Sequence, residues 1–350
     1  MKAIILAGGE GTRLRPFTLM RPKCLLPLVN RPLLSYQFSL LKKYGIGEVV
    51  LAVRAGQPGL AEITRLGQSF SLSVKFSVEK SPLGTAGAVR QAMSLFRSRE
   101  PFLVFNGDFV ADFNLERVVR IHQEKKAWAT IVLTRVEKPS DYGLVVLEET
   151  GMVKNFVEKP KAEEVVTDTI NAGAYVLSQE VVEAIPSGRN VSIERETFPA
   201  LLKSGKPVIG YIHYGYWLDV GSLPTFWKAT VDILEGRLSP ELIPPVQEEK
   251  PVGSVKVEGK VCLGRRGLIK PGVVLRGYVV IGNECYVGEN CLLEDVVLFD
   301  RAAVRASTRL HHSLIGQATI VGANCSLKGA VIGDGSYLSD FSQTDSRNGL

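Results

Sequence analysis

The sequence predicts an α/β protein in two parts, a mostly parallel sheet covered by helices and then a β-helix. From residue 1 to about 235, short apolar runs alternate with stretches in which apolar residues recur every three or four positions, as strands and amphipathic helices do. After about residue 258, apolar residues recur every six positions. A segment rich in proline separates the two patterns. We therefore expect domains at residues 1–235 and 259–342, joined by a linker at 236–258.

The apolar runs predict the strands of the sheet, and the periodic stretches predict its helices. Ligands of such sheets bind beyond the carboxyl ends of the strands, so we expect functional residues in the loops that follow strands. The expected strands are Ala3–Leu6, Val49–Val53, Phe102–Phe105, Thr130–Leu133 and Ala174–Leu177, and the expected helices include Leu33–Tyr44, Thr85–Ser94 and Leu115–Lys125.

The period of six predicts short parallel strands stacked in coils, with the repeated apolar residue turned inward. Its phase slips near residues 305–313 and again before Ile332, where we expect a loop or an irregular corner. Cys285, Cys291 and Cys325 fall in inward slots for small residues, which indicates core packing. The repeated residues are Ile269, Leu275, Ile281, Val287, Leu293 and Phe299, continued by Ile315, Val321, Leu327, Ile332 and Leu338.

The amino-acid composition limits the kinds of function that we expect for the protein. The net charge is +6 in a chain of 350 residues, with no long run of Lys or Arg, which favours anionic substrates over nucleic acid. The five cysteines include no metal-type pair and indicate reduced thiols. We find neither a signal peptide nor a stretch that could span a membrane, so we expect a cytoplasmic protein.

The loop after the first strand has the composition of a phosphate-binding turn. Its glycines allow backbone N–H groups to turn toward a phosphate or a base. Arg13 can grip phosphate oxygens with two parallel hydrogen bonds, and Lys23, next to Pro22, supplies a compact charge. The loop lacks the third glycine of the dinucleotide motif and the Gly-Lys-Ser/Thr of a P-loop. It reads Leu6-Ala7-Gly8-Gly9-Glu10-Gly11-Thr12-Arg13-Leu14-Arg15-Pro16.

The stretch from Ala7 to Pro16, followed by Arg21-Pro22-Lys23, resembles the signature of the sugar-1-phosphate nucleotidyltransferases. The resemblance implies a Rossmann-like catalytic domain in which Arg13 and Lys23 contact the phosphates of a nucleoside triphosphate. Cys24 stands where many members carry proline. The glycine-loop residues implied to hold the nucleotide are Leu6, Ala7, Gly8, Gly9, Gly11 and Thr12.

A reaction between two phosphates needs charge neutralisation, for which Mg²⁺ held by one or two carboxylates is suited. Asp108, in Asn106-Gly107-Asp108 after an expected strand, and Asp219, in Trp217-Leu218-Asp219-Val220-Gly221, match family motifs whose aspartates bind the metal. The sugar phosphate is itself the nucleophile, so no enzyme nucleophile is needed. The expected catalytic residues are Arg13, Lys23 and Asp108.

The resemblance extends to the sugar phosphate and the base. Phe156-Val157-Glu158-Lys159-Pro160 looks like the sugar-phosphate element, with Lys159 on the phosphate and Glu158 on sugar hydroxyls. Glu79, in a segment that resembles the base-reading element, can accept both adjacent donors of guanine and favours GTP. Further positions implied for the sugar phosphate are Asn106, Gly107, Tyr142, Gly143, Asn171 and Gly173, and those for the nucleotide are Pro82, Gly84 and Thr85.

Together these motifs look like those of mannose-1-phosphate guanylyltransferases, which often append a left-handed β-helix. The expected reaction joins GTP and mannose 1-phosphate and releases pyrophosphate. Glucose uridylyl-, thymidylyl- or adenylyltransfer and heptose guanylyltransfer remain alternatives, as does a non-catalytic subunit that senses nucleotide sugars. An acyltransferase activity of the β-helix, using His311 or His312, is a further alternative. We expect the β-helix to mediate homo-oligomerisation instead.

Overall fold

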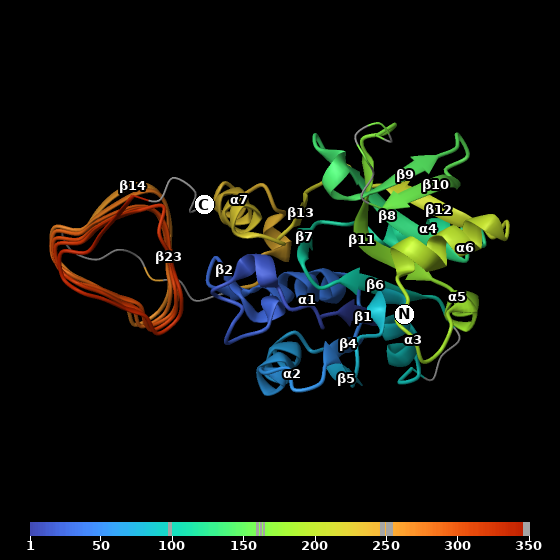
Figure 1. The fold of residues 1–350 in the computed structure, drawn as a ribbon, viewed down its shortest axis with the longest axis horizontal. Helices are drawn as coiled ribbons and strands as arrows, with labels where there is room; N and C mark the ends of the chain where they lie inside the picture. The colour runs from blue at the N-terminus through green and yellow to red at the C-terminus, as the bar shows by residue number, and fades with distance from the viewer. Residues whose placement is uncertain are drawn as a thin grey trace. The chain divides into compact units, whose positions relative to one another are not determined.

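A computed structural model describes residues 1–96, 100–158, 161, 163, 165–245, 249 and 255–345 (Figure 1). The chain divides into two compact units. We call the first, Met1–Gly9 with Tyr36–Trp217, the sheet unit. The second, Glu10–Ser35 with Leu218–Leu350, is the β-helix unit. The glycine loop is therefore shared, because its first residues belong to one unit and its later residues to the other.

The sheet unit contains a nine-stranded sheet in the order β10-β9-β11-β6-β1-β4-β5, with β8 beside β11 and β12 beside β8. Strand β1 runs parallel to β4 and β6, and β5 runs parallel to β4. These strands confirm the expected parallel arrangement for this half of the sheet. The bounds are β1 (Ala3–Leu6), β4 (Glu48–Arg54), β5 (Ser73–Glu79), β6 (Phe102–Asn106), β7 (Phe109–Ala111), β8 (Ala129–Arg135), β9 (Gly143–Leu147), β10 (Val153–Glu158), β11 (Thr169–Leu177), β12 (Val208–Ile212) and β13 (Trp217–Asp219).

The other half of the sheet is mixed, which the sequence did not predict. Strand β11, which contains the expected strand Ala174–Leu177, runs antiparallel to both β6 and β8. The chain passes from β8 to β11 through the antiparallel pair β9 and β10. A parallel connection needs a crossover, usually a helix. Among the described residues, no α-helix lies between β8 and β11.

The helices follow the expected alternation. Helix α3 packs on β1, β4 and β5, α4 packs on β8 and β11, and α6 packs on β10 and β12. The expected helices at Leu33–Tyr44, Thr85–Ser94 and Leu115–Lys125 are confirmed within one residue at each end. The bounds are α1 (Leu33–Lys43), α2 (Leu60–Ser69), α3 (Gly84–Met93), α4 (Leu115–Glu124), α5 (Gln179–Ala184), α6 (Phe198–Lys203) and α7 (Leu223–Leu234), with single turns η1 (Thr12–Leu14), η2 (Lys23–Leu25), η3 (Pro139–Asp141), η5 (Ile193–Thr197) and η6 (Pro240–Leu242).

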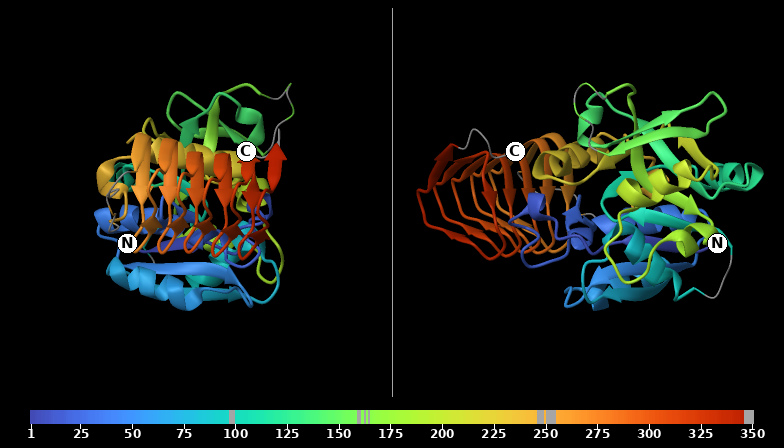
Figure 2. Two further views of the ribbon diagram at one scale, coloured as in Figure 1. Left: turned by 90° about the vertical axis from the view of Figure 1, so that its left-hand side faces the viewer. Right: turned by 45° about the vertical axis from the view of Figure 1, so that its right-hand side comes forward.

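The second unit contains the predicted β-helix, whose coils stack into a prism of triangular outline (Figures 1 and 2). One face is the sheet β14-β16-β18-β20-β22-β25, with β23 also paired to β20, and another is β15-β17-β19-β21-β24. All pairings are parallel. The bounds are β14 (Lys256–Leu263), β15 (Leu268–Ile269), β16 (Val274–Ile281), β17 (Tyr286–Val287), β18 (Leu292–Leu298), β19 (Ala303–Val304), β20 (Arg309–Ile315), β21 (Ile320–Val321), β22 (Ser326–Lys328), β23 (Val331–Ile332), β24 (Tyr337–Leu338) and β25 (Gln343–Asp345), after the short pair β2 (Pro27–Leu28) and β3 (Arg31–Pro32).

The first phase slip of the repeat lies earlier than the sequence suggested. Leu298, not Phe299, pairs in register with Ile281, and Ile315 pairs with Leu298. The register shifts between Arg276 and Val279, where one residue drops out of the next coil. Phe299 is instead buried against the rings of Phe17 and Phe226. The expected inward column is therefore wrong at this position, because this coil is one residue shorter than three repeats of six and brings Leu298 into the column.

The β-helix cysteines pack in the core, as expected. All five cysteines are buried and none forms a disulfide, and Cys285, Cys291 and Cys325 belong to the apolar core of the β-helix. Burial raises the pKa of the Cys285 thiol to about 12. Among the helices that the structure describes, none has the length and apolar character needed to cross a membrane.

Candidate functional site

The end of β1 lies against the turn that follows β6. The amide of Ala7 donates to the carbonyl of Ala52 at 2.9 Å, and the amide of Gly107 donates to the carbonyl of Leu6 at 3.0 Å. A Cβ atom on Gly107 would lie only 2.6 Å from that same carbonyl oxygen. The turn Asn106-Gly107-Asp108 can therefore pack on the glycine loop only because residue 107 has no side chain.

Glu79, at the end of β5, lies beside the same loop. A Cβ atom on Gly8 would lie 3.5 Å from Glu79 Oε1 and 3.5 Å from the amide nitrogen of Arg54. Glu79 Oε2 accepts a hydrogen bond from the Leu83 amide at 3.2 Å. Burial raises the pKa of Glu79 above its usual value, and the bond from Leu83 opposes that rise. The structure thus brings the predicted base reader next to the predicted phosphate loop.

Three of the residues predicted for the sugar phosphate lie together at Gly173. This glycine has a φ of 72°, and a Cβ atom there would lie 2.8 Å from Asn106 Nδ2. Its amide donates to Asn171 Oδ1 at 3.0 Å, and Asn171 Nδ2 donates to the Tyr175 hydroxyl at 2.8 Å. Asn106, Asn171 and Gly173 therefore form one contact group at the sheet edge.

Glu194 connects this group to the predicted nucleotide segment. Its carboxylate accepts from Thr85 Oγ1 at 2.9 Å, from Ser192 Oγ at 3.0 Å and from the Tyr175 hydroxyl at 3.3 Å. The Thr85 hydroxyl also accepts from the Ile193 amide at 2.8 Å. Sequence reasoning assigned no role to Glu194, because its partner Thr85 lies 109 positions away in the sequence.

Gln37 in α1 is a second residue that sequence reasoning missed. It is buried, and its Nε2 donates to the carbonyls of Asn106 at 2.8 Å and Phe109 at 3.3 Å. These bonds hold the turn that carries Asp108, which is half-buried. A glutamine on an apolar helix face was the only sequence signal.

Other predicted residues of the sheet unit lie around the same strands. The rings of Tyr142 and Trp217 are 5.7 Å apart, and Trp217 Nε1 donates to the Ala172 carbonyl at 2.9 Å. Gly143 pairs with Glu158 across β9 and β10. Lys159 lies outside the described residues.

The start of α3 closes tightly on a neighbouring loop. Gly84 has a φ of 70°, and a Cβ atom there would meet the Val191 carbonyl at 2.5 Å. The carbonyl of Pro82 accepts from Asn190 Nδ2 at 3.4 Å. This packing fixes the segment that carries Thr85.

The β-helix unit holds the cationic part of the signature. Gly11 has a φ of 62°, and its carbonyl accepts from Thr18 Oγ1 at 2.8 Å. A Cβ atom on Gly11 would lie 3.2 Å from Lys23 Cβ, so Lys23 packs against the loop. Thr12 and Arg13 are exposed on η1.

Asp219 and Arg13 both lie beside Gly221 in the same unit. A Cβ atom on Gly221 would lie 2.8 Å from Arg13 Nη2 and 2.8 Å from Asp219 Oδ2. The missing side chain of Gly221 thus leaves room for a guanidinium and a carboxylate together. Among the described residues, no three His, Cys, Asp or Glu side chains gather in a way that could hold a metal.

Two histidines of the sheet unit are buried and hydrogen-bonded. His122 is buried between Thr130 and Ser178, at 3.0 Å from each hydroxyl. Burial lowers the pKa of His122 to about 4, against a smaller opposing effect of Glu180. His213 is buried beside Asp112, at 2.9 Å.

Comparison with known proteins gives two family matches and several named relatives. The family described as Nucleotidyl transferase matches residues 2–236, and the family described as GMPPB C-terminal domain matches residues 257–341. A mannose-1-phosphate guanylyltransferase of Mycobacterium tuberculosis is 34% identical over 87% of this chain and 81% of its own. A UTP–glucose-1-phosphate uridylyltransferase of Synechocystis is 30% identical over 90% of this chain and 87% of its own.

The fold also resembles that of a solved structure. A Bacillus anthracis structure described as a glucose-1-phosphate thymidylyltransferase superposes with a TM-score of 0.59 at 25% identity, over 66% of this chain and 94% of that one. The resemblance to sugar-1-phosphate nucleotidyltransferases is thereby confirmed. The chain belongs to the Nucleotidyl transferase family and carries the C-terminal domain of the GMPPB type.

Proposed function

We propose that this enzyme transfers GMP from GTP to mannose 1-phosphate. The observation that carries the proposal is that Gly8 lies beside Glu79 and Gly173 lies beside Asn106. Asn106 in turn pairs with Leu6 across β1 and β6, so residues predicted separately for the nucleotide and the sugar follow neighbouring strands. Relatives named as mannose-1-phosphate guanylyltransferases support the choice of substrates. A relative named as a uridylyltransferase keeps UTP and glucose 1-phosphate as the second candidates.

The reaction is a displacement at the α-phosphorus of the triphosphate. A phosphate oxygen of the sugar 1-phosphate forms a new bond to this phosphorus, the bond to the β-phosphate bridging oxygen breaks, and pyrophosphate leaves. The work of the enzyme is to align two anions and neutralise their charge. Arg13 and Lys23 bind the triphosphate, Lys159 binds the acceptor phosphate, and Glu158 and Asn171 orient the sugar.

Asp108 and Asp219 each offer hard carboxylate oxygens, the kind of ligand that a magnesium ion prefers. Mg²⁺ is usually held by only one or two carboxylates together with phosphates and waters. Bound there, it would neutralise the charge that develops on the phosphates.

Glu79 is proposed to read the base. Guanine presents N1–H and an exocyclic amine side by side, and an ionised carboxylate can accept from both. The position of Glu79 beside Gly8 supports this role, because the base of a nucleotide whose phosphates lie on the loop must lie within reach of it. The imide of uracil offers one donor between two carbonyls and would fit a carboxylate less well.

The test is a substrate matrix. The protein is incubated with Mg²⁺, each nucleoside triphosphate and each of mannose, glucose and heptose 1-phosphate, and pyrophosphate release is measured. We expect the highest kcat/KM for GTP with mannose 1-phosphate and no turnover by Asp108→Ala. A clear preference for UTP and glucose 1-phosphate would establish the second candidate. Consumption of acetyl coenzyme A would instead support the acyltransferase alternative.

The β-helix is proposed to mediate self-association. The outward residues of β15, β17, β19, β21 and β24 are in register and form an apolar ladder, in which Ala303 is half-buried and the other four are exposed (Leu268, Tyr286, Ile320 and Tyr337). A twofold axis through Ala303 would place Leu268 on Tyr337 and Tyr286 on Ile320 of a second copy, so that each aromatic ring meets an aliphatic side chain.

The ladder exposes on the order of 400 Å² of apolar surface, less than the roughly 800 Å² per partner of a stable interface. We therefore expect a dimer whose formation depends on concentration. Tyr337→Lys should shift sedimentation to the monomer at micromolar concentration, while Val257→Lys, an exposed apolar position on the other sheet, should not. Equal behaviour of both variants would contradict this surface. The assembled enzyme is expected in the cytoplasm, where its thiols stay reduced.

A further inference from the structure

Arg21 belongs to the Arg21-Pro22-Lys23 signature, but its side chain is bound by the β-helix. Its Nη2 lies 2.5 Å from Asp334 Oδ2 and 2.8 Å from Gln317 Oε1. The guanidinium also lies 5.8 Å from the centre of the Phe299 ring. The side chains of Arg21 and Asp334 are only 16% and 14% exposed, so water screens this ion pair less than it screens a surface pair.

Asp334 is held in place by the coil below it. Its Oδ1 accepts a hydrogen bond from the Gln317 amide at 2.7 Å. A Cβ atom on Gly316 would lie 2.5 Å from the Asp334 amide nitrogen, so the backbones of the two coils are in close contact there. One carboxylate oxygen therefore completes the coil corner, and the other binds Arg21.

Further contacts fix the same segment to the β-helix. The ring of Phe17 packs edge-on against Phe299 at 4.9 Å, and both are buried. Asn30 Nδ2 donates to the Ile281 carbonyl at 2.9 Å. Gly333 lies against the ring of Pro16, since a Cβ atom there would be 3.1 Å from Pro16 Cβ. The segment that carries Arg13 and Lys23 is thus packed on the coils at several points.

We propose that Arg21 is a positioning residue for nucleotide binding, and that Asp334 and Gln317 of the β-helix hold it. Lys23 starts η2 two residues after Arg21, and the intervening Pro22 has a restricted backbone. Fixing Arg21 therefore fixes the point from which Lys23 projects. The inference rests on the proposed function in one respect, namely that Lys23 contacts the triphosphate.

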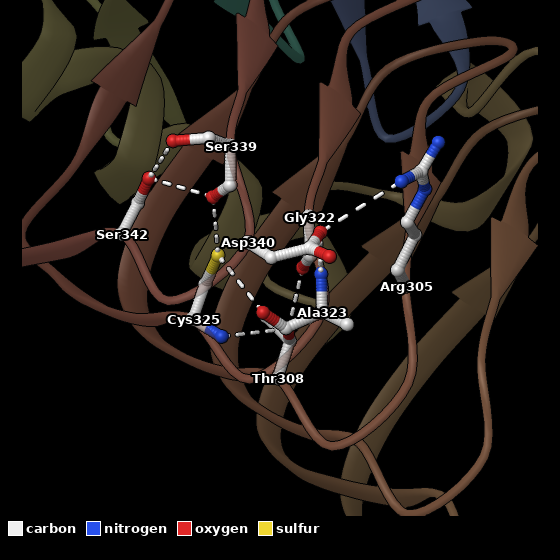
Figure 3. Close-up of polar contacts among 8 residues, drawn as sticks. All are labelled: Arg305, Thr308, Gly322, Ala323, Cys325, Ser339, Asp340 and Ser342. Carbon is white, nitrogen blue, oxygen red and sulfur yellow. Dashed lines mark hydrogen bonds and ion pairs between the residues drawn. The ribbon is translucent and has the colours of Figure 1, made fainter.

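The chain offers a matched control for Asp334. Asp340 also completes a coil corner, because its Oδ1 accepts from the Ala323 amide at 2.9 Å (Figure 3). Its ion-pair partner is Arg305 of the β-helix itself, at 3.7 Å, and both side chains are nearly half exposed. Asp340→Asn therefore perturbs the same kind of corner without touching the signature segment.

The test compares Asp334→Asn with Asp340→Asn in the full chain. We expect Asp334→Asn to raise the KM for GTP about tenfold and to leave the KM for the sugar 1-phosphate within twofold, while Asp340→Asn changes neither. Arg21→Ala should raise the KM for GTP as Asp334→Asn does. The double variant should show no further rise in this KM, since both changes remove the same contact. Equal effects of the two asparagine variants, or equal rises of both KM values, would show a merely structural role and overturn the proposal.

A second measurement separates this proposal from the proposed function. Amide hydrogen exchange of residues 12–26 should be faster in Asp334→Asn than in Asp340→Asn, without any substrate present. If the wild type turns over no substrate pair, the proposed function fails, and the dissociation constant for GTP then replaces KM in the comparison. Unchanged exchange together with unchanged GTP binding would refute positioning by Arg21. Gln317→Leu is the milder variant if Asp334→Asn folds poorly.

Discussion

Gly107→Ala gives the sharpest test of the geometry at the sheet edge. The added Cβ atom would lie 2.6 Å from the Leu6 carbonyl oxygen, a backbone atom that cannot rotate away. The turn must move by at least 0.4 Å to reach a separation of 3.0 Å and by 0.8 Å to reach an ordinary contact of 3.4 Å. Asp108, the next residue, would move with it.

The size of this movement sets the expected loss of activity. A misplacement of about 1 Å can cost roughly 100-fold in rate, so we expect kcat to fall between about 10-fold and 100-fold. This corresponds to about 1.4–2.7 kcal/mol in the activation free energy. Pyrophosphate release is the assay, and thermal unfolding shows whether the variant is folded.

Gly47→Ala is the matched control. A Cβ atom there would meet no other atom within 4 Å, and its backbone is not in the left-handed region. We expect its kcat to stay within twofold of the wild type. If Gly107→Ala keeps wild-type activity, or if both variants lose activity equally, the turn does not place Asp108 as we argue.

Three further predictions follow from buried ionisable groups. Because burial raises the pKa of Glu79, its carboxylate ionises at a higher pH than that of an ordinary Glu. The GTP-to-UTP ratio of kcat/KM should rise as this group ionises with increasing pH, and a Glu79→Gln variant should show a lower ratio without this rise. Burial lowers the pKa of His122 from 6.5 to about 4, so between these two pH values this histidine is protonated in the unfolded state but neutral in the folded state. Its contribution to the free energy of unfolding should therefore fall by about 3 kcal/mol between pH 6.5 and 4. Denaturant titrations of His122→Gln should show a smaller fall. With its pKa raised to about 12, Cys285 should not react with iodoacetamide at pH 8 until the protein unfolds, and peptide mapping that finds it labelled in the native state would contradict its burial.

Local patterns predicted most of the fold. Strands such as Ala3–Leu6 and helices such as Leu115–Lys125 were visible because their periodicity is set by the face that each element buries. The direction of β11 was not visible. It depends on the connection through β9 and β10, and an apolar run such as Ala174–Leu177 reads the same in a parallel or an antiparallel pair.

The candidate site was predicted in part for a similar reason. Loops that follow strands pointed to Gly8, Asn106 and Asp108, because the topology of such sheets brings these loops together. Glu194 and Gln37 act through hydrogen bonds to residues 109 and 69 positions away in the sequence. No local pattern reports such partners, so only the structure reveals them.

Arg21 shows why membership in a motif does not decide the role of a residue. The signature contains four basic side chains, Arg13, Arg15, Arg21 and Lys23, that could each have been assigned to phosphate. The sequence cannot rank them, because all are cations in one short segment. The ion pair of Arg21 with Asp334, 313 positions away, commits its charge to the β-helix, and Arg13 and Lys23 are the signature cations that we propose for the phosphates. The register shift that moves Phe299 out of the inward column also contributes to this contact. The ring of Phe299 packs against Phe17 and lies under Arg21. An irregularity of the repeat thus creates the surface on which the signature segment is held.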